Sequence, residues 1–330
     1  MAEIIRITDV APRDGLQNEQ GIVPTEDKVR LIDLLLRAKV DEIEATSFVS
    51  PKWIPQLADA EEVLAGVRKN IEAVQPSLTS PLPEGEGAGG DPPIRFAPAA
   101  TLSVLVPNAQ GFERALAIHR AGLPLKIAVF TAASETFSQK NTNATIAETI
   151  ERFNQFLPAA FDEGMDVRMY ISCAVACPFE GAIAPDNVRA VADQLLALAP
   201  TSALNDGRVE IDLGDTIGAA NPSDIAALLS VFTPTEIEQL LVLHLHDTQG
   251  RAADCARTAI ELGVGSFDAS AGGLGGCPYA GTPENPAPGN IATSTLLDTI
   301  EAMGMETNID RAALNEASAF ARSIIEKAHP

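Results

Sequence analysis

The sequence predicts one α/β domain folded as a (β/α)8 barrel. Short apolar or β-branched runs alternate with longer helical patterns along the 330 residues, which is typical of parallel strands joined by crossover helices. Eight such units can be counted, and eight strands close a barrel of this kind. The length is at the upper end for a single α/β domain, so we expect residues 1–330 to form one domain.

Each predicted strand is a short apolar segment that precedes a helical stretch. The first helix is predicted to begin after Pro24-Thr25, because acidic residues follow in its opening turn, and Thr145 with Glu148 forms a capping box at the fourth. A helical stretch from about Asp310 to Lys327 exceeds the eight units, and we expect it to cover a barrel end or to form an oligomer contact. The predicted strands begin near Ile4, Asp41, Leu102, Leu125, Val167, Arg208, Leu241 and Ser266.

A segment rich in proline and glycine separates the second predicted helix from the third predicted strand. Residues 76–100 contain six prolines and four glycines. This composition predicts an extended or disordered surface loop. A helix-to-strand connection lies at the barrel end opposite to the one that carries active sites, so we expect no effect of this insertion on activity.

The composition excludes some classes of partner and favours a cytoplasmic location. A formal charge of −22 argues against binding to nucleic acid or to an anionic membrane, since either would need a basic surface. An anionic substrate would need local cations, for which Arg13, Lys52 and Lys140 are candidates in polar stretches. The four cysteines form no CxxC pair, and neither a signal segment nor a membrane-spanning stretch is evident. We therefore expect a cytoplasmic protein.

Two of the four histidines lie two positions apart in an apolar run. The run reads Leu-His-Leu-His-Asp-Thr-Gln-Gly and contains His244 and His246. In a strand, side chains two apart leave the same face, so the two imidazoles would stand side by side. A lone buried histidine is more often a core residue with one hydrogen bond, but a pair on one strand face favours metal ligation.

Polar residues mark the end of every predicted strand. Active residues of this fold gather where strands end, so eight polar ends in succession indicate a lined pocket, although a single one could be a helix cap. These ends comprise Thr8-Asp9 with residues 13–19, Glu42, Glu44, Thr46, Ser47, Asn108, Ser134-Glu135, Ser172-Cys173, Asp212, Asp215-Thr216, the two histidines and Asp268.

Two further residues are candidates for chemistry in this pocket. Asp14 is the nearest carboxylate that we expect in a loop, where it could join the histidines around a divalent cation; the alternative is a turn aspartate before Gly15. Histidine with oxygen ligands suits octahedral Mg²⁺ or Mn²⁺ better than a closed zinc site. Cys277 follows a glycine-rich run at the last strand end, where a thiol can serve acid-base chemistry, the alternative being a structural thiol.

Several segments together resemble one enzyme family. They are Pro12–Glu19, Glu44–Trp53, Ser172–Gly181, Leu213–Gly218, the histidine pair and the Gly-Gly-Cys-Pro-Tyr loop. In order, from about Ile7 to about Leu297, they resemble the 3-hydroxy-3-methylglutaryl-CoA (HMG-CoA) lyases. The motifs Thr-Ser-Phe-Val-Ser-Pro-Lys-Trp and Gly-Leu-Gly-Gly-Cys-Pro-Tyr-Ala together separate these lyases from other metal-dependent carbon-carbon lyases and synthases.

The resemblance implies a TIM barrel that cleaves HMG-CoA into acetyl-CoA and acetoacetate with Mg²⁺ or Mn²⁺, as in leucine degradation. It implies an acyl-CoA thioester as substrate and a homo-oligomer, a dimer or higher. The implied metal ligands are Asp14, His244, His246 and Asn290. The implied catalytic residues are Arg13, Glu44, Asp215, His246 and Cys277, and the implied substrate-binding residues are Arg13, Gln17, Lys52 and Lys140.

The chemistry of this cleavage requires such residue types. Negative charge moves onto the thioester oxygen of the departing enolate, where the Arg13 guanidinium would stabilise it. The hydroxyl proton could go to water, His246 or Asp215, and Cys277 could protonate the enolate carbon. Residues 281–289 depart from the family pattern, because this proline-rich segment just before Asn290 is longer than in the relatives.

Three alternatives remain open on the residues alone. A Claisen-type synthase that condenses an acyl-CoA with a 2-oxo acid would share Arg13, Asp14 and the histidine pair. A lyase for a related 3-hydroxyacyl-CoA would share nearly every motif. A non-catalytic barrel that binds metal or CoA belongs to another functional class, and it predicts binding without turnover.

Overall fold

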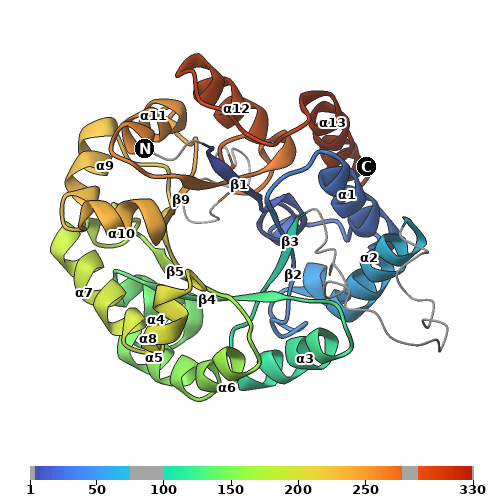
Figure 1. The fold of residues 1–330 in the computed structure, drawn as a ribbon, viewed down its shortest axis with the longest axis horizontal. Coiled ribbons are helices and arrows are strands. Elements are labelled where there is room, and N and C mark those ends of the chain that lie inside the picture. The colour runs from blue at the N-terminus through green and yellow to red at the C-terminus, as the bar shows by residue number, and fades with distance from the viewer. Residues whose placement is uncertain (1–3, 75–99, 277–288, 329–330) are drawn as a thin grey trace, which may run out of the picture.

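The protein folds as a closed parallel barrel surrounded by helices (Figure 1). The structure is a computed structural model that describes residues 4–74, 100–276 and 289–328. The strand order is β1-β10-β9-β8-β5-β4-β3-β2, and β1 pairs with both β10 and β2. The barrel strands are β1 (Arg6–Asp9), β2 (Glu42–Ser47), β3 (Thr101–Leu105), β4 (Lys126–Ala132), β5 (Val167–Ser172), β8 (Val209–Asp215), β9 (Leu241–Leu245) and β10 (Ser266–Ala269).

The barrel confirms the predicted fold class, and each strand begins within two residues of its predicted start. A short antiparallel hairpin of β6 (Ala176–Cys177) and β7 (Gly181–Ala182) follows β5. The helices are α1 (Thr25–Arg37), α2 (Ala60–Val74), α3 (Ala109–Arg120), α4 (Glu135–Thr142), α5 (Ile146–Asn154), α6 (Leu157–Asp162), α7 (Pro185–Leu196), α8 (Thr201–Asn205), α9 (Pro222–Leu229), α10 (Pro234–Gln239), α11 (Ala252–Glu261), α12 (Thr293–Ala302) and α13 (Arg311–Ala328).

The helix starts follow the expected local signals. Helix α1 begins directly after Pro24, and both hydrogen bonds of the capping box between Thr145 and Glu148 are present at α5. Helix α13 lies in the outer ring, where it packs against α1 and the short turn η3 (Ala271–Gly273). The surface loop predicted for residues 76–100 lies outside the described part of the chain except for its last residue.

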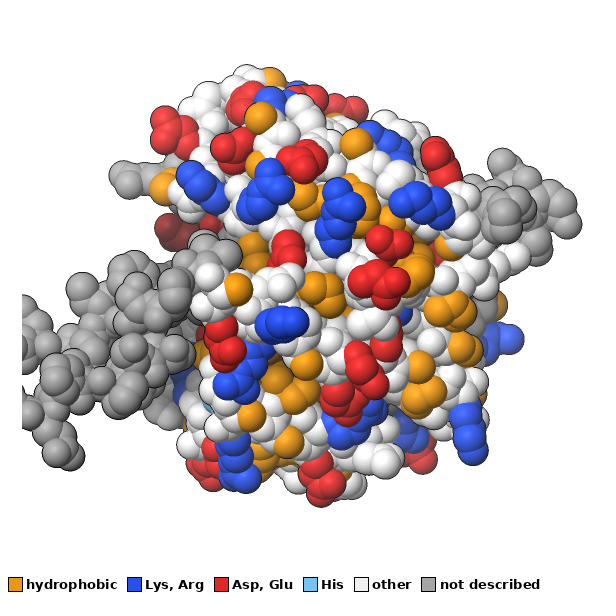
Figure 2. Space-filling model, turned by 90° about the vertical axis from the view of Figure 1, so that its right-hand side faces the viewer, with side chains coloured by type: hydrophobic (Ala, Val, Ile, Leu, Met, Phe, Trp, Pro, Cys, Tyr) orange, Lys and Arg blue, Asp and Glu red, His pale blue; other side chains and the backbone are white. Residues whose placement is uncertain are grey.

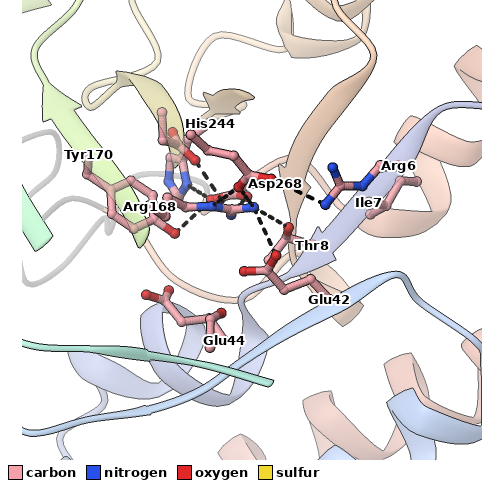
Figure 3. Close-up of polar contacts among 12 residues, drawn as sticks. Arg6, Ile7, Thr8, Glu42, Glu44, Arg168, Tyr170, His244 and Asp268 are labelled. Carbon is pink, nitrogen blue, oxygen red and sulfur yellow. Dashed lines mark hydrogen bonds and ion pairs between the residues drawn. The ribbon is translucent and has the colours of Figure 1, made fainter. Parts of the chain in front are cut away.

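Strand periodicity divides the side chains between the helix layer and the barrel interior. In β9, Leu243 is buried in the hydrophobic core, whereas the neighbouring His244 faces the interior and the pocket. The interior below the pocket is filled by an ionic cluster. Arg168 is fully buried and donates to Glu210, Asp268 and Thr8 at 2.9, 2.6 and 2.9 Å (Figure 3).

A second cation completes this cluster. The Nζ atom of Lys126 contacts both Glu42 and Glu210, which also neighbour Arg168. Buried charges are costly without partners, and here each cation has at least two carboxylates. The cluster therefore closes the interior below the carboxyl ends of the strands, so that the pocket lies at those ends.

One local expectation is wrong. Asp14 was expected in a loop, but it lies in a π-helical turn, η1 (Ala11–Gly15), directly after β1. Short π-helical segments recur at functional sites, and this one places two successive polar side chains, Arg13 and Asp14, at the pocket.

The surface does not concentrate charge of one sign on the face that carries α1, α2 and α13. Basic and acidic side chains alternate there (Figure 2). Within the described residues, no helix is both long and apolar enough to cross a membrane.

Candidate active site

A pocket of about 650 Å³ opens at the carboxyl ends of the strands. Six of the predicted site residues line it together, although they come from distant parts of the sequence. They are Arg13, Asp14, Gln17, Lys140, His244 and His246. Apolar side chains such as Val49, Ile54 and Phe130 form another part of the wall, so the pocket can hold a molecule that is partly charged and partly apolar.

The two histidines direct one nitrogen each at the same point. Their Nε2 atoms are 3.3 Å apart, and both rings are buried. The Nδ1 atom of His246 lies 2.7 Å from the carbonyl oxygen of Thr216, and that of His244 lies 3.0 Å from an Asp268 carboxylate oxygen. A carbonyl or carboxylate oxygen accepts a hydrogen bond, so each Nδ1 carries the proton. In the neutral rings, both Nε2 lone pairs therefore face each other.

The pKa values of the two rings shift in opposite directions because their surroundings differ. Burial disfavours a charge on His244, but the hydrogen bond with Asp268 and the negative charges of Asp268 and Asp14 together outweigh this effect and raise its pKa. Burial and the neighbouring His244 lower the pKa of His246 to about 4. His246 is thus neutral at physiological pH, with a free electron pair on Nε2, which is the form that binds a cation.

Asp14 and Asn290 complete a cluster of ligand atoms. A carboxylate oxygen of Asp14 and a ring nitrogen of each histidine all lie within 4.8 Å of one another. Asn290 pairs with His246 in a β-bridge, and its Nδ2 donates to Asp14 at 2.9 Å and to the Leu274 carbonyl at 3.0 Å. Its Oδ1 is buried and accepts no hydrogen bond from the described residues.

The cluster fits a divalent cation. Two facing nitrogen lone pairs repel each other, and a buried amide oxygen without a partner among the described residues is unfavourable, so a cation bound between them would relieve both. Burial opposes the charge on Asp14, but Arg13, the two histidines and the Asn290 hydrogen bond together outweigh it and lower the Asp14 pKa to about 2. The donor set of two imidazoles and two oxygens suits a divalent cation.

Arg13 lies beside this cluster and is held by two carboxylates. Its Nε and Nη2 donate to one oxygen of Glu44 at 2.6 and 2.5 Å, and its Nη1 donates to Asp14 at 2.7 Å. Burial raises the pKa of Glu44 to about 7 despite the nearby guanidinium. Glu44 is fully buried and does not line the pocket, so it fixes the orientation of Arg13 from behind.

Two predicted residues, Asp215 and Lys52, are not brought into this group, and a third lies outside the described part of the chain. The Asp215 carboxylate accepts hydrogen bonds from the backbone amides of Ala219 and Ala220 at 3.0 and 2.9 Å, and Asp215 is absent from the described pocket wall. Lys52 is exposed and also outside that wall, whereas the adjacent Trp53 is part of it. Cys277 lies outside the described residues.

Asp268 was predicted only as one of the polar strand ends, and the Thr216 carbonyl was not predicted as a site group. Asp268 accepts hydrogen bonds from His244, Arg168 and the Tyr170 hydroxyl, and so connects the histidine to the ionic cluster (Figure 3). The sequence signal for Asp268 was its place near the end of a predicted strand, and in the structure it pairs in register with His244 on the neighbouring strand. The role of the Thr216 carbonyl had no signal in the sequence, since every residue has a carbonyl.

Comparisons with known proteins agree on one family. A model of the HMGL-like family matches residues 4–84 and 94–321. The mitochondrial hydroxymethylglutaryl-CoA lyase of Bos taurus is 40% identical over 96% of this chain and 84% of the relative. The cytoplasmic 3-hydroxy-3-methylglutaryl-CoA lyase of Danio rerio is 42% identical over 96% of this chain and 82% of the relative.

Solved structures give the same result. The HMG-CoA lyase of Brucella melitensis is 41% identical with a TM-score of 0.80, covering 98% of this chain and all of that one. An HMG-CoA lyase of Acinetobacter baumannii, solved in complex with coenzyme A and 3-methylmalate, is 31% identical with a TM-score of 0.77, covering 98% of this chain and 92% of that one. This TIM-barrel chain therefore belongs to the HMGL-like family, together with the hydroxymethylglutaryl-CoA lyases.

Proposed function

We propose that the protein cleaves HMG-CoA into acetyl-CoA and acetoacetate in a reaction that depends on a divalent cation. The observation that carries this proposal is the pair of facing Nε2 atoms, 3.3 Å apart, next to Asp14 and Arg13 in one pocket. The family relationship supplies the substrate class, because relatives about 40% identical over 96% of the chain are named as lyases of this thioester.

The proposed cation ligands are Asp14, His244, His246 and Asn290. When bound there, Mg²⁺ or Mn²⁺ supplies Lewis-acid activation of the substrate hydroxyl and fixes its orientation. Asp268 and the Thr216 carbonyl hold the two imidazoles in the tautomer that presents Nε2. The Asn290 amide donates to Asp14 through Nδ2, which leaves its Oδ1 as the ligand atom.

Arg13 is the proposed electrophilic group. As the carbon-carbon bond breaks, charge develops on the thioester oxygen, and a guanidinium stabilises that charge more than it stabilises the neutral carbonyl. Glu44 and Asp14 hold the guanidinium on two sides, so its remaining N–H groups have a fixed direction. The role of Glu44 in this proposal is to position Arg13.

The two candidate proton acceptors differ in their placement. His246 lines the pocket, but a ligand role and a base role would use the same Nε2, and we propose the ligand role. Asp215 directs both carboxylate oxygens at backbone amides, which favours a role in holding the loop after β8. We retain Cys277 as the proposed donor of a proton to the enolate carbon.

The proposed substrate side of the pocket contains Gln17 and Lys140. Both line the wall, and the Lys140 ammonium lies 4.7 Å from the centre of the Phe179 ring. These groups suit an acyl-CoA thioester, which has an apolar arm and anionic groups. A contribution of the exposed Lys52 to the anionic end of this substrate is also proposed.

A turnover assay tests the proposal directly. The protein is loaded with Mn²⁺ or Mg²⁺ and given HMG-CoA, and acetoacetate is measured for the wild type and for His244→Ala. We expect turnover by the wild type and a loss of at least about 10³-fold in the variant, because a bound cation contributes several kcal/mol to charge stabilisation. Equal turnover by both proteins would contradict the metal site.

Product analysis with several acyl-CoA thioesters, and with acetyl-CoA plus a 2-oxo acid, separates the alternatives. Acetyl-CoA condensed with a 2-oxo acid would indicate a synthase, and faster cleavage of another 3-hydroxyacyl-CoA would indicate a related lyase. Tight binding of CoA and Mn²⁺ with no product would indicate a non-catalytic barrel.

We also propose a cytoplasmic homo-oligomer that acts in leucine degradation and binds neither nucleic acid nor a membrane. The interspersed charges in Figure 2 and the formal charge of −22 support the last point. Size-exclusion chromatography with light scattering measures the oligomeric state.

A further inference from the structure

A buried carboxylate near the proposed cation site has no cationic partner among the residues that the structure describes. Asp9, the last residue of β1, has 0% of its surface exposed. None of the ion pairs formed among the described residues includes it. A buried charge without a counter-ion is costly, so its presence requires another reason.

The Asp9 carboxylate accepts hydrogen bonds from three separate chain segments. Its Oδ1 accepts from the backbone amides of Ala11 at 3.0 Å and Ala271 at 3.2 Å. Its Oδ2 accepts from the hydroxyl of Thr293 at 2.7 Å. These donors open the turn η1, the turn η3 and the helix α12, respectively.

Each of these three segments also contributes one group to a second junction, a second set of hydrogen bonds at the pocket. In each segment, that group lies three residues from the group that is hydrogen-bonded to Asp9. Asp14 follows Ala11 by three residues, Leu274 follows Ala271 by three, and Asn290 precedes Thr293 by three. The Asn290 amide joins this second junction, because its Nδ2 donates to both Asp14 and the Leu274 carbonyl. The same three segments are therefore fastened twice, once at their bases by Asp9 and once at the pocket by Asn290.

We propose that Asp9 is a positioning residue that sets the placement of Asp14 relative to Asn290 and thereby the affinity of the cation site. The inference rests on the proposed cation site but not on the identity of the substrate. Ligand placement controls affinity because a preorganised site loses less conformational freedom on binding. Without the lower junction, the Asn290 side chain would provide the only direct hydrogen bond between η1 and the segment that leads into α12 among the described residues.

The test measures Mn²⁺ binding by the purified protein, using the electron paramagnetic resonance signal of free Mn²⁺. Asp9→Leu has a similar shape but accepts no hydrogen bond, so we expect its dissociation constant for Mn²⁺ to rise about 10- to 100-fold. Asp9→Asn can keep all three contacts, because its amide nitrogen can donate to the Thr293 hydroxyl, which then acts as acceptor. We expect this conservative variant to restore affinity to within about threefold of the wild type.

A matched control lies near the other end of the same strand. Asp41 also accepts two hydrogen bonds, from the backbone amide of Ile7 at 2.9 Å and from Asn308 at 3.0 Å, but it lies just before β2, at the amino ends of the strands, and outside the pocket wall. Asp41→Leu should lower the melting temperature and leave the Mn²⁺ dissociation constant within about twofold, since no ligand depends on that junction. Thr293→Val removes one link with little change in shape and should weaken binding about threefold to tenfold.

Several outcomes would overturn the proposal. A folded Asp9→Leu protein with wild-type Mn²⁺ affinity would do so, as would an equal loss of affinity in Asp41→Leu. Where Asp9→Leu does not fold, wild-type affinity in Thr293→Val would overturn it equally. A wild type that binds no Mn²⁺ removes both the cation site and this role of Asp9. A wild type that binds Mn²⁺ but does not cleave HMG-CoA contradicts the proposed reaction, and the variants still decide the role of Asp9.

Discussion

Replacing Arg13 by lysine separates the charge of this residue from its geometry. The guanidinium directs Nε and Nη2 at Glu44 and Nη1 at Asp14, and one further N–H remains on each terminal nitrogen. Arg13 lines the pocket, so these remaining groups are the ones that can reach a substrate oxygen. A lysine has a single side-chain nitrogen, which would form hydrogen bonds with the same two carboxylates.

The expected loss follows from the number of donors removed. Removing one donor from a developing negative charge typically lowers turnover about 10²- to 10³-fold, or roughly 3–4 kcal/mol. We therefore expect kcat of Arg13→Lys to fall by about 10²- to 10³-fold, while KM changes by less than about threefold because the ground-state carbonyl is neutral. Steady-state kinetics with HMG-CoA at saturating Mn²⁺ measures both constants.

Arg114→Lys is the matched control for this experiment. Arg114 also forms a bidentate pair with one carboxylate, Glu61, at 2.5 and 2.6 Å, but it lies outside the pocket wall. Its replacement should leave kcat within about twofold, since surface ion pairs contribute little. An Arg13→Lys enzyme with kcat within about threefold of the wild type would refute the argument from guanidinium geometry.

Three further changes test other parts of the structure. Leu243→Ala removes a fully buried side chain between the strand and the helix layer and should lower the free energy of unfolding by about 2–5 kcal/mol in urea titrations; a loss below about 1 kcal/mol would contradict its core position. Burial raises the pKa of Asp9 from 3.8 to about 6, so between these pH values the folded state binds more protons than the unfolded state. The wild type should therefore lose thermal stability relative to Asp9→Asn as pH rises from about 4 to 7, and a constant difference in melting temperature would argue against the raised pKa. Arg251 donates to the carbonyls of the two residues whose amides bind Asp215, so Arg251→Ala and Asp215→Asn should both lower kcat, about threefold to tenfold; a loss in Asp215→Asn alone, at least tenfold larger, would instead support a direct chemical role for Asp215.

The sequence predicted the fold well because the signals for a barrel are local. Alternation of apolar strands with helices depends on neighbouring residues alone, and all eight strands lie where it placed them. The spacing of His244 and His246 is local in the same sense, since side chains two apart on a strand share a face. Both rings accordingly line the pocket.

The local pattern could not predict which polar residues at the strand ends face the pocket. Eight polar ends indicated a lined pocket, and Asn108, Ser172 and Thr216 do line it, whereas Asp215 and Asp268 do not. A strand end places successive side chains on opposite faces, and only the pairing of strands decides which face a residue takes. The turn η1 adds a further difficulty, because one extra residue in a helical turn changes the direction of Asp14 without any marked signal in the sequence.

The carboxylates show why residue type alone does not give a role. Asp14 faces two imidazoles and is suited to hold a cation, Asp268 orients one of those imidazoles, and Asp215 holds backbone amides. Asp9 joins three segments that are far apart in the sequence. Its hydrogen bond with Thr293 spans a sequence separation of 284 residues. Such a junction exists only after the barrel has closed, because β1 and β10 become neighbours at that step. Closure of the barrel is therefore what turns Asp9, an apparently ordinary strand-end aspartate, into a residue on which the placement of Asp14 and Asn290 depends.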